Sequence, residues 1–237
     1  MNEVFVMGAL LMTVLYRHFV GPVLFFNFFY RNLKRWQRFK IQKKAPLIEK
    51  IKFDKKNTFK SAVVDLSIIG IVFVLYARGH MKLNFDLDWR NIASNVVVFG
   101  LLFFIQDLYF YLTHALFHRR KLYRHVHAIH HHSTNPTPWT SFSHHFLENF
   151  VELLVYPLVL YFLPLNFFVL ICFVLTTTTI NFLGHCGFEV ESLSLSRFRY
   201  FKWVASFTFH NRHHQYFNGN YGLYFTIWDR VFKTEIK

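Results

Sequence analysis

Apolar residues fall in long runs along this chain of 237 residues, and polar residues gather between the runs. Three of the runs cover about residues 4–30, 61–77 and 92–113. An α-helix needs about 20 predominantly apolar residues to cross a bilayer, and each run approaches or exceeds that length. The pattern therefore predicts membrane-spanning helices.

The first apolar run carries polar and helix-breaking residues in its middle. They are Arg17, His18, Gly21 and Pro22. Because proline removes a backbone hydrogen bond and crowds the preceding turn, this run predicts either one kinked helix or two shorter helices.

A fourth apolar segment, residues 150–182, is too long for one simple span. Pro164 and Asn166 lie near its middle, where proline favours a break in the helix. We predict a helical hairpin that enters the membrane and returns on the same side. Together, the runs predict an all-α integral membrane bundle of about four to five membrane-embedded helices.

Lysine and arginine concentrate in residues 31–60, between the first and second runs. Cytoplasmic loops of membrane proteins carry an excess of these residues, so we predict that this loop is cytoplasmic. Since successive spans alternate in direction, residues 114–149 and the tail from residue 184 onward are predicted on the same face. Thirteen of the fifteen histidines fall at or after His114. We therefore expect a histidine-rich helical cap that faces the cytoplasm.

Composition narrows the class of protein. Hydrophobic residues make up 53% of the chain, more than in an average soluble domain. The net charge of +14 lies mainly between apolar runs, as membrane-flanking charge does, so we predict no nucleic-acid partner. Cys172 and Cys186 form neither a disulfide framework nor a CxxC metal motif. We divide the chain into membrane helices with the basic loop, residues 1–92, and a catalytic region, residues 93–237, within one structural unit.

Three histidine clusters carry the candidate chemistry. The first has the spacing HxxxH, and the other two have the spacing HxxHH. Residues three or four apart share one face of a helix, so their imidazoles can converge on a metal. The cluster members are His114 and His118, then His127, His130 and His131, and finally His210, His213 and His214.

Imidazole is a suitable ligand for iron, zinc, copper and nickel. Eight ligands exceed what one ion uses, since zinc takes about four, so two ions are the natural number. The chain has no HExxH motif, which argues against a zinc hydrolase of that type. We therefore predict two non-haem iron ions and a reaction with O2.

Further motifs surround these clusters, and together they resemble the fatty acid hydroxylase/sterol desaturase superfamily. The resemblance covers about residues 95–234. The motifs are Asp107-Leu-Tyr-Phe-Tyr, Asn135-Pro-Thr-Pro-Trp139, His145 with Glu148, an NxxxH segment from Asn181 to His185, Asn220-Tyr-Gly and Trp228-Asp-Arg230.

The resemblance implies a membrane-bound di-iron oxygenase of the endoplasmic reticulum or a bacterial inner membrane. It implies the eight cluster histidines as ligands, with His185 as a ninth and His145 as a tenth. Phe146 stands where the family often has proline, and Cys186 stands where a small residue such as serine is common. The first departure weakens the assignment of His145.

Two carboxylates are candidate catalytic or ligand-orienting residues. Asp107 lies inside an apolar run, where an ionisable group points to function. It either orients a histidine or pairs with a basic side chain near the membrane surface. Glu148, together with Glu152, follows His145 on a similar helical face and is expected to support a ligand. We interpret His125, His132 and His144 as neighbours of the ligands or surface residues, and predict no catalytic role for His18 and His80.

The sequence thus predicts an oxidoreductase that hydroxylates or desaturates a sterol, fatty acyl chain or related lipid with O2. Because the chain has no flavin- or dinucleotide-binding glycine motif, electrons must come from an external donor of the cytochrome b5, ferredoxin or reductase type. Two alternatives remain open at this point. One is a histidine-rich membrane metal carrier or transporter, and the other is a zinc-dependent membrane hydrolase.

Overall fold

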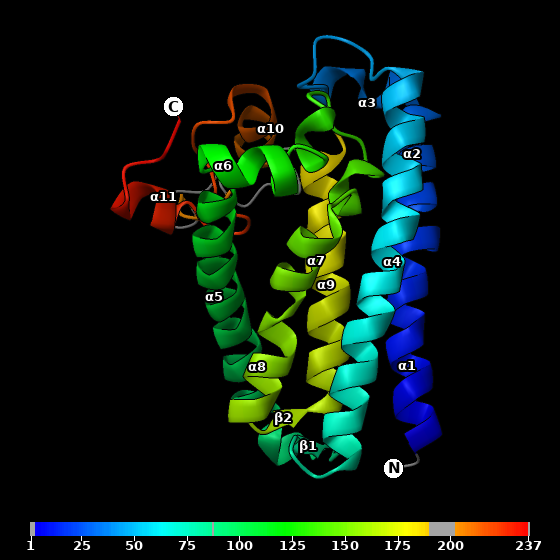
Figure 1. The fold of residues 1–237 in the computed structure, drawn as a ribbon, viewed down its shortest axis with the longest axis vertical. Coiled ribbons are helices and arrows are strands. Elements are labelled where there is room, and N and C mark those ends of the chain that lie inside the picture. Colours follow the sequence, from blue (N-terminus) through cyan, green and yellow to red (C-terminus); the bar gives the residue numbers. More distant parts are fainter. Residues whose placement is uncertain (1–2, 87, 190–201, 237) are drawn as a thin grey trace.

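The computed structural model describes residues 3–86, 88–189 and 202–236, and these form a helical bundle with a cap at one end (Figure 1). The predicted all-α class is confirmed. In chain order the elements are α1 (Glu3–Leu15), η1 (Tyr16–Val20), α2 (Gly21–Tyr30), α3 (Leu33–Trp36), η2 (Gln37–Phe39), α4 (Ile48–Ala77), β1 (Leu83–Asn84), η3 (Trp89–Asn91), α5 (Ile92–Phe117), α6 (Arg120–Leu122), η4 (Tyr123–His127), η5 (His130–His132), η6 (Thr140–Phe142), α7 (Phe146–Leu153), α8 (Val155–Phe162), β2 (Leu165–Asn166), α9 (Phe167–His185), α10 (Phe207–Tyr216) and α11 (Ile227–Val231).

Four helical segments of the described chain are long and apolar enough to cross a membrane. They are Glu3–Tyr30, Ile48–Ala77, Ile92–Phe117 and Phe167–His185. Large apolar side chains on their outer faces are exposed, as at Val96 (65%) and Val97 (70%) of α5. Because such a surface is stable in hydrocarbon and unfavourable in water, the bundle is that of a membrane protein.

The first span is one continuous helical segment, which decides between the two alternatives for this run. Its middle turn, η1, is a π-helix, and Pro22 sits in the first turn of α2, where proline is well tolerated. Gly21 lies where a Cβ atom would overlap the ring of Phe182 on α9. The glycine therefore allows the first span to approach α9 closely.

The second span begins earlier than hydropathy indicates, because α4 already starts at Ile48. One face of its first turns is polar but buried, with Asp54 1% exposed and Thr58 fully buried. Asp54 Oδ2 accepts hydrogen bonds from Ser133 (2.7 Å) and Thr140 (2.6 Å). The helix thus extends beyond the apolar run at residues 61–77, because Asp54 and Thr58 face the cap rather than lipid or water.

The predicted hairpin is present. Helices α7 and α8 run away from the cap, the chain turns at β2, and α9 returns to the cap (Figure 1). At the turn, β2 pairs in parallel with β1, with Leu83 opposite Leu165 and Asn84 opposite Asn166. Inside the bundle, α4, α5, α8 and α9 bury a shared apolar cluster that includes Ile68, Leu102, Leu160 and Phe173.

The cap consists of short elements at the end of the bundle opposite the N-terminus (Figure 1). It contains α6, η4, η5, η6, α10 and α11. The last turns of α5 and α9 thus end at the same place in the cap, where they meet α10 and η5.

A candidate metal centre of two histidine groups

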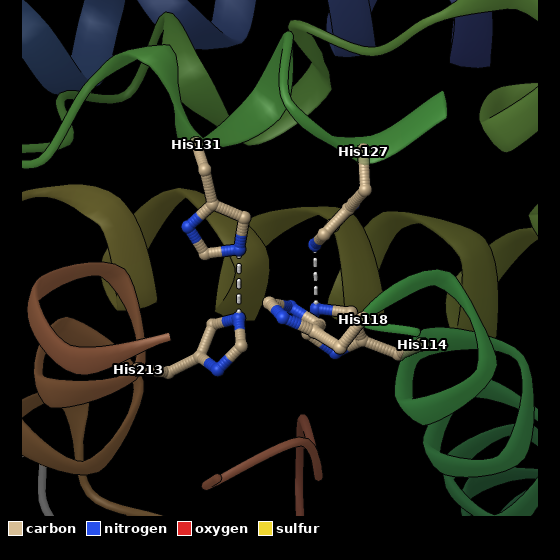
Figure 2. Close-up of side chains that lie close together, drawn as sticks. All are labelled: His114, His118, His127, His131 and His213. Atoms are coloured by element: carbon tan, nitrogen blue, oxygen red, sulfur yellow. Dashed lines mark hydrogen bonds between the residues drawn. The ribbon is translucent and has the colours of Figure 1, made fainter. Parts of the chain in front are cut away.

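Nine histidines of the described residues converge in the cap as two adjoining groups. In each group, one potential ligand atom per residue lies within 4.8 Å of the others. The first group comprises His114, His118, His127, His131 and His213, and is drawn in Figure 2. The second group comprises His130, His185, His210 and His214.

Local structure explains how each HxxHH motif serves both groups. In each motif the first and last histidines, which are four residues apart, join one group, while the middle histidine joins the other. His127 and His131 enter the first group and His130 enters the second. Conversely, His210 and His214 enter the second group and His213 the first. The two motifs are therefore complementary, and each ties both groups together.

The remaining members come from the ends of long helices. His114 lies in the last turn of α5, and His118 is its C-cap residue. His185 is the last residue of α9. The bundle itself therefore fixes how far these rings stand from the cap motifs.

Hydrogen bonds fix the tautomers of three rings. The Nδ1 atoms of His114, His185 and His213 lie 2.8–2.9 Å from the carbonyl oxygens of Tyr221, Asn181 and Gly219, respectively. A carbonyl only accepts, so Nδ1 carries the proton and Nε2 offers a lone pair.

Those lone pairs point into the histidine groups. His114 Nε2 lies 3.0 Å from His127 Nε2, and His213 Nε2 lies 3.0 Å from His131 Nε2 (Figure 2). In addition, the Nε2 atoms of His118 and His214 are buried and have no hydrogen-bond partner among the described residues. Convergent lone pairs and unpartnered buried nitrogens are what metal cations satisfy, so the donor set fits imidazole-bound metal ions.

Burial keeps these rings neutral, which metal binding requires. Removal from water lowers the pKa of His213 to about 4 and that of His118 to about 2. The pKa values of His127, His131 and His214 are also lowered well below the usual range, first by burial and then by neighbouring imidazoles. Near pH 7 the rings therefore present lone pairs rather than positive charge.

Glu148 supports the first group. Its Oε1 accepts a hydrogen bond of 2.7 Å from His127 Nδ1, and both side chains are almost fully buried. A carboxylate in this position orients a metal-binding imidazole and increases its basicity. The structure thus places Glu148 beside His127, one of the predicted ligands.

Asp107 acts on a different part of the structure from the one expected. Its Oδ1 accepts the backbone N–H groups of Leu223 (3.1 Å) and Tyr224 (2.6 Å), and no contact with a histidine is seen among the described residues. Asp229 accepts the N–H groups of Tyr221 and Gly222 in the same loop. Because the Tyr221 carbonyl holds His114, the two carboxylates orient this histidine through the loop.

His145 stands apart from both groups. It is half-buried, caps α7, and accepts a hydrogen bond from Leu147 N through its Nδ1 atom. Its neighbour His144 is buried instead, with its ring 4.7 Å from that of His130 and Nδ1 3.4 Å from Glu152 Oε2. His144, His130 and Glu148 also form a third set of potential ligand atoms. Sequence spacing gave no signal for His144, because it follows a turn and not a helix.

The fold and the site define a helical membrane protein with a candidate metal centre built from two adjoining histidine groups. The model of the fatty acid hydroxylase family matches residues 99–234, and the chain belongs to this family. The chain is also similar to curated sterol desaturases.

Three curated relatives illustrate the similarity. The rat (Rattus norvegicus) protein named lathosterol oxidase is 32% identical over 68% of this chain and 52% of its own length. The human (Homo sapiens) protein of that name is 31% identical over 70% of this chain and 55% of its own. The Delta(7)-sterol 5(6)-desaturase of Saccharomyces cerevisiae is 30% identical over 72% and 46%, respectively. The chain thus spans about half the length of the curated relatives it matches. No solved structure matches it.

Proposed function

We propose that this protein is a membrane-bound di-iron oxygenase that hydroxylates or desaturates a sterol-like lipid with O2 and external electrons. The observation that carries the proposal is the convergence of nine histidines, eight of them buried, in two groups of five and four. One ion per group uses this number of imidazoles, and nitrogen-rich sites suit redox-active iron. The names of the relatives favour a sterol as the substrate class.

The first ion would be held by His114, His118, His127, His131 and His213, and the second by His130, His185, His210 and His214. Bound iron would supply the activation of O2 and the removal of hydrogen from an unactivated C–H bond. Since neutral imidazoles leave the positive charge of the ions uncompensated, Glu148 contributes a negative charge beside the first group.

The chain's own residues hold and shield this centre. Glu148 and the carbonyls of Tyr221 and Gly219 fix the ring orientations, so that little reorganisation accompanies metal binding. Most of the nine rings are less than 5% exposed, which keeps bulk water away from the reaction. The apolar spans would bring a membrane-dissolved substrate to the centre.

A test begins with iron analysis of the purified, detergent-solubilised protein, followed by product analysis under labelled oxygen. Incorporation of label from O2, or loss of two hydrogens, supports an oxygenase. Incorporation from water would indicate a hydrolase, and metal-dependent transport without oxygen consumption would indicate a carrier. A His130→Ala/His213→Ala double variant removes one ring from each group and should abolish activity.

The matched control is His125→Ala, because His125 is exposed and belongs to neither group. This variant should keep both iron and activity. Full activity of the double variant, or of iron-free protein, would contradict the proposal.

The setting of the reaction is also proposed. We expect the protein to lie in the membrane of the endoplasmic reticulum or in a bacterial inner membrane, with the cap on the cytoplasmic side. The reason is that the basic residues 31–60 lie at the cap end of the bundle. We expect electrons from an external carrier of the cytochrome b5, ferredoxin or reductase type. Exposed basic residues around the cap would attract an acidic carrier.

A further inference from the structure

Three cavities follow one another through the bundle toward the second histidine group. An open groove of ≈ 760 Å³ lies between α1 and α9. An apolar cavity of ≈ 60 Å³ lies further inside and shares Thr13 with the groove. A third cavity of ≈ 40 Å³ shares Arg17, Leu153 and Tyr156 with the apolar cavity. The shared wall residues show that the three cavities are neighbours, in order from the outer faces of α1 and α9 toward the cap.

The third cavity is polar, and it adjoins the candidate metal centre. We call it the polar chamber; its polar lining includes Arg17, Gln106, Glu152 and Asn181. The Asn181 carbonyl holds His185 Nδ1 at 2.8 Å. Glu152 contacts His144, whose ring lies 4.7 Å from that of His130. His185 thus contacts a residue of the chamber wall directly, and His130 is linked to the wall through His144.

The chamber wall offers hydrogen-bonding groups that the described protein leaves unused. Gln106 Oε1 and Asn181 Oδ1 are buried acceptors without a hydrogen-bond partner. Buried acceptors of this kind are rare unless a ligand or water satisfies them. A hydroxyl group fits this wall, because it can donate to either amide oxygen and accept from the neighbouring guanidinium of Arg17.

The charges of the chamber favour a neutral group over an anion. Arg17 Nε lies 3.3 Å from Asp65 Oδ2, and His18 Nε2 lies 3.0 Å from the same oxygen. Arg17 is therefore already paired, and burial raises the pKa of Glu152 in the wall to about 8, so this side chain is mostly neutral near pH 7. A carboxylate or phosphate entering this space would meet no unpaired cation among the described wall residues.

The size of the chamber agrees with that assignment. A volume of ≈ 40 Å³ is close to the roughly 30 Å³ that one water molecule occupies in the liquid. The chamber therefore has room for a small polar group such as a hydroxyl, while the groove, at ≈ 760 Å³, lies within the usual range of ligand sites, about 300–1,000 Å³. The body of a lipid would occupy the groove and the apolar cavity.

We propose that the polar chamber binds the hydroxyl head of the lipid substrate, with Gln106, Asn181 and Arg17 as the residues that select for it. This inference rests on the proposed function and assigns the residues that recognise the hydroxyl group of a sterol-like substrate. The alcohol enters head first between α1 and α9, so the carbon that is oxidised lies close to the hydroxyl. Arg17 belongs to the first span, outside the matched residues 99–234, and provides specificity rather than chemistry.

The experiment compares a lipid alcohol with its deoxy analogue. The probe pairs are lathosterol with 3-deoxylathosterol, and hexadecanol with hexadecane. Thermal stabilisation of the metal-free, detergent-solubilised protein reports binding, and product formation by the iron-loaded protein reports turnover. The variants are Gln106→Leu and the charge-balanced double variant Arg17→Met/Asp65→Leu. Gln37→Leu is the matched control, because Gln37 is exposed on η2.

We expect the unsubstituted protein to prefer a lipid alcohol by about tenfold or more, since the deoxy analogue leaves buried polar groups unpaired. Gln106→Leu and the double variant should lower the preference for the alcohol over its deoxy analogue about tenfold, because they weaken binding of the alcohol alone. Gln37→Leu should leave this preference unchanged. Equal binding of both members of each pair would overturn the inference, as would an equal loss for both members in the variants. A chamber that holds only water would give that equal result.

The binding arm separates this inference from the proposed function. If the protein selects the alcohol yet oxidises neither member with iron bound, the oxygenase proposal fails and the hydroxyl site stands. If it oxidises both members with equal efficiency, the oxygenase proposal stands and the hydroxyl site fails.

Discussion

The contact between Glu148 and His127 gives the sharpest quantitative prediction. The Oε1···Nδ1 distance is 2.7 Å, and the two side chains are 0% and 1% exposed, so water cannot replace the carboxylate. Loss of such an outer partner typically weakens metal binding 10- to 100-fold, which corresponds to about 1.4–2.7 kcal/mol. Glu148→Ala should therefore weaken the first metal by this amount, with a smaller effect in Glu148→Gln, which can still accept the hydrogen bond.

The assay is competition of the loaded protein against a graded series of chelators, with metal content read by elemental analysis. The number of ions retained per chain should fall from about two toward one in Glu148→Ala, because the second group keeps all four of its histidines. Glu49→Gln is the matched control, since Glu49 is exposed at the start of α4. An affinity of folded Glu148→Ala equal to that of the unsubstituted protein would refute the role assigned to this carboxylate.

Three other predictions follow from single contacts. Asp107→Asn should reduce metal retention, because it weakens the hydrogen bond that holds the loop at Tyr224, although Asp107 contacts no histidine among the described residues. Metal retention equal to that of the unsubstituted protein in the chelator assay would argue against this. Gly21→Ala should destabilise the protein by about 1–3 kcal/mol, because the added methyl group overlaps Phe182, and an unchanged melting temperature would contradict the close approach. The metal-free protein should lose stability as the pH falls from about 6.5 toward 4. Burial lowers the pKa of His213 to about 4 in the folded protein, so the unfolded chain takes up this proton at a higher pH and is favoured. A melting temperature that stays constant across this range would contradict the prediction.

Hydropathy predicted the spans well because a membrane helix must present apolar side chains over its whole lipid-facing length. It gave no indication of the first turns of α4, where Asp54 and Thr58 are polar but bond to Ser133, Thr140 and the Trp139 carbonyl. It also left the first run undecided, because Arg17 and His18 look like an interruption. In the structure both face Asp65 on the neighbouring span, so the helix continues through them.

Histidine spacing was informative for a similar reason. Residues four apart on a helical turn point the same way, so HxxxH pairs can share an ion. Spacing did not indicate that the middle histidine of each HxxHH motif, His130 or His213, joins a different group from the other two histidines of its motif. That division depends on how η5 and α10 face each other, and it takes both motifs to specify it.

The sequence by itself determined that the chain is a helical membrane protein with histidine motifs near span ends, because hydropathy and helical spacing are local properties. Only the tertiary structure decided the rest. It divided nine rings between two groups and left His145 outside them. It placed His144 in a third set with His130 and Glu148, and used Asp107 to hold a loop. It also placed Arg17 of the first span beside the cap. These relations join residues far apart in sequence, and the packing of helices sets them.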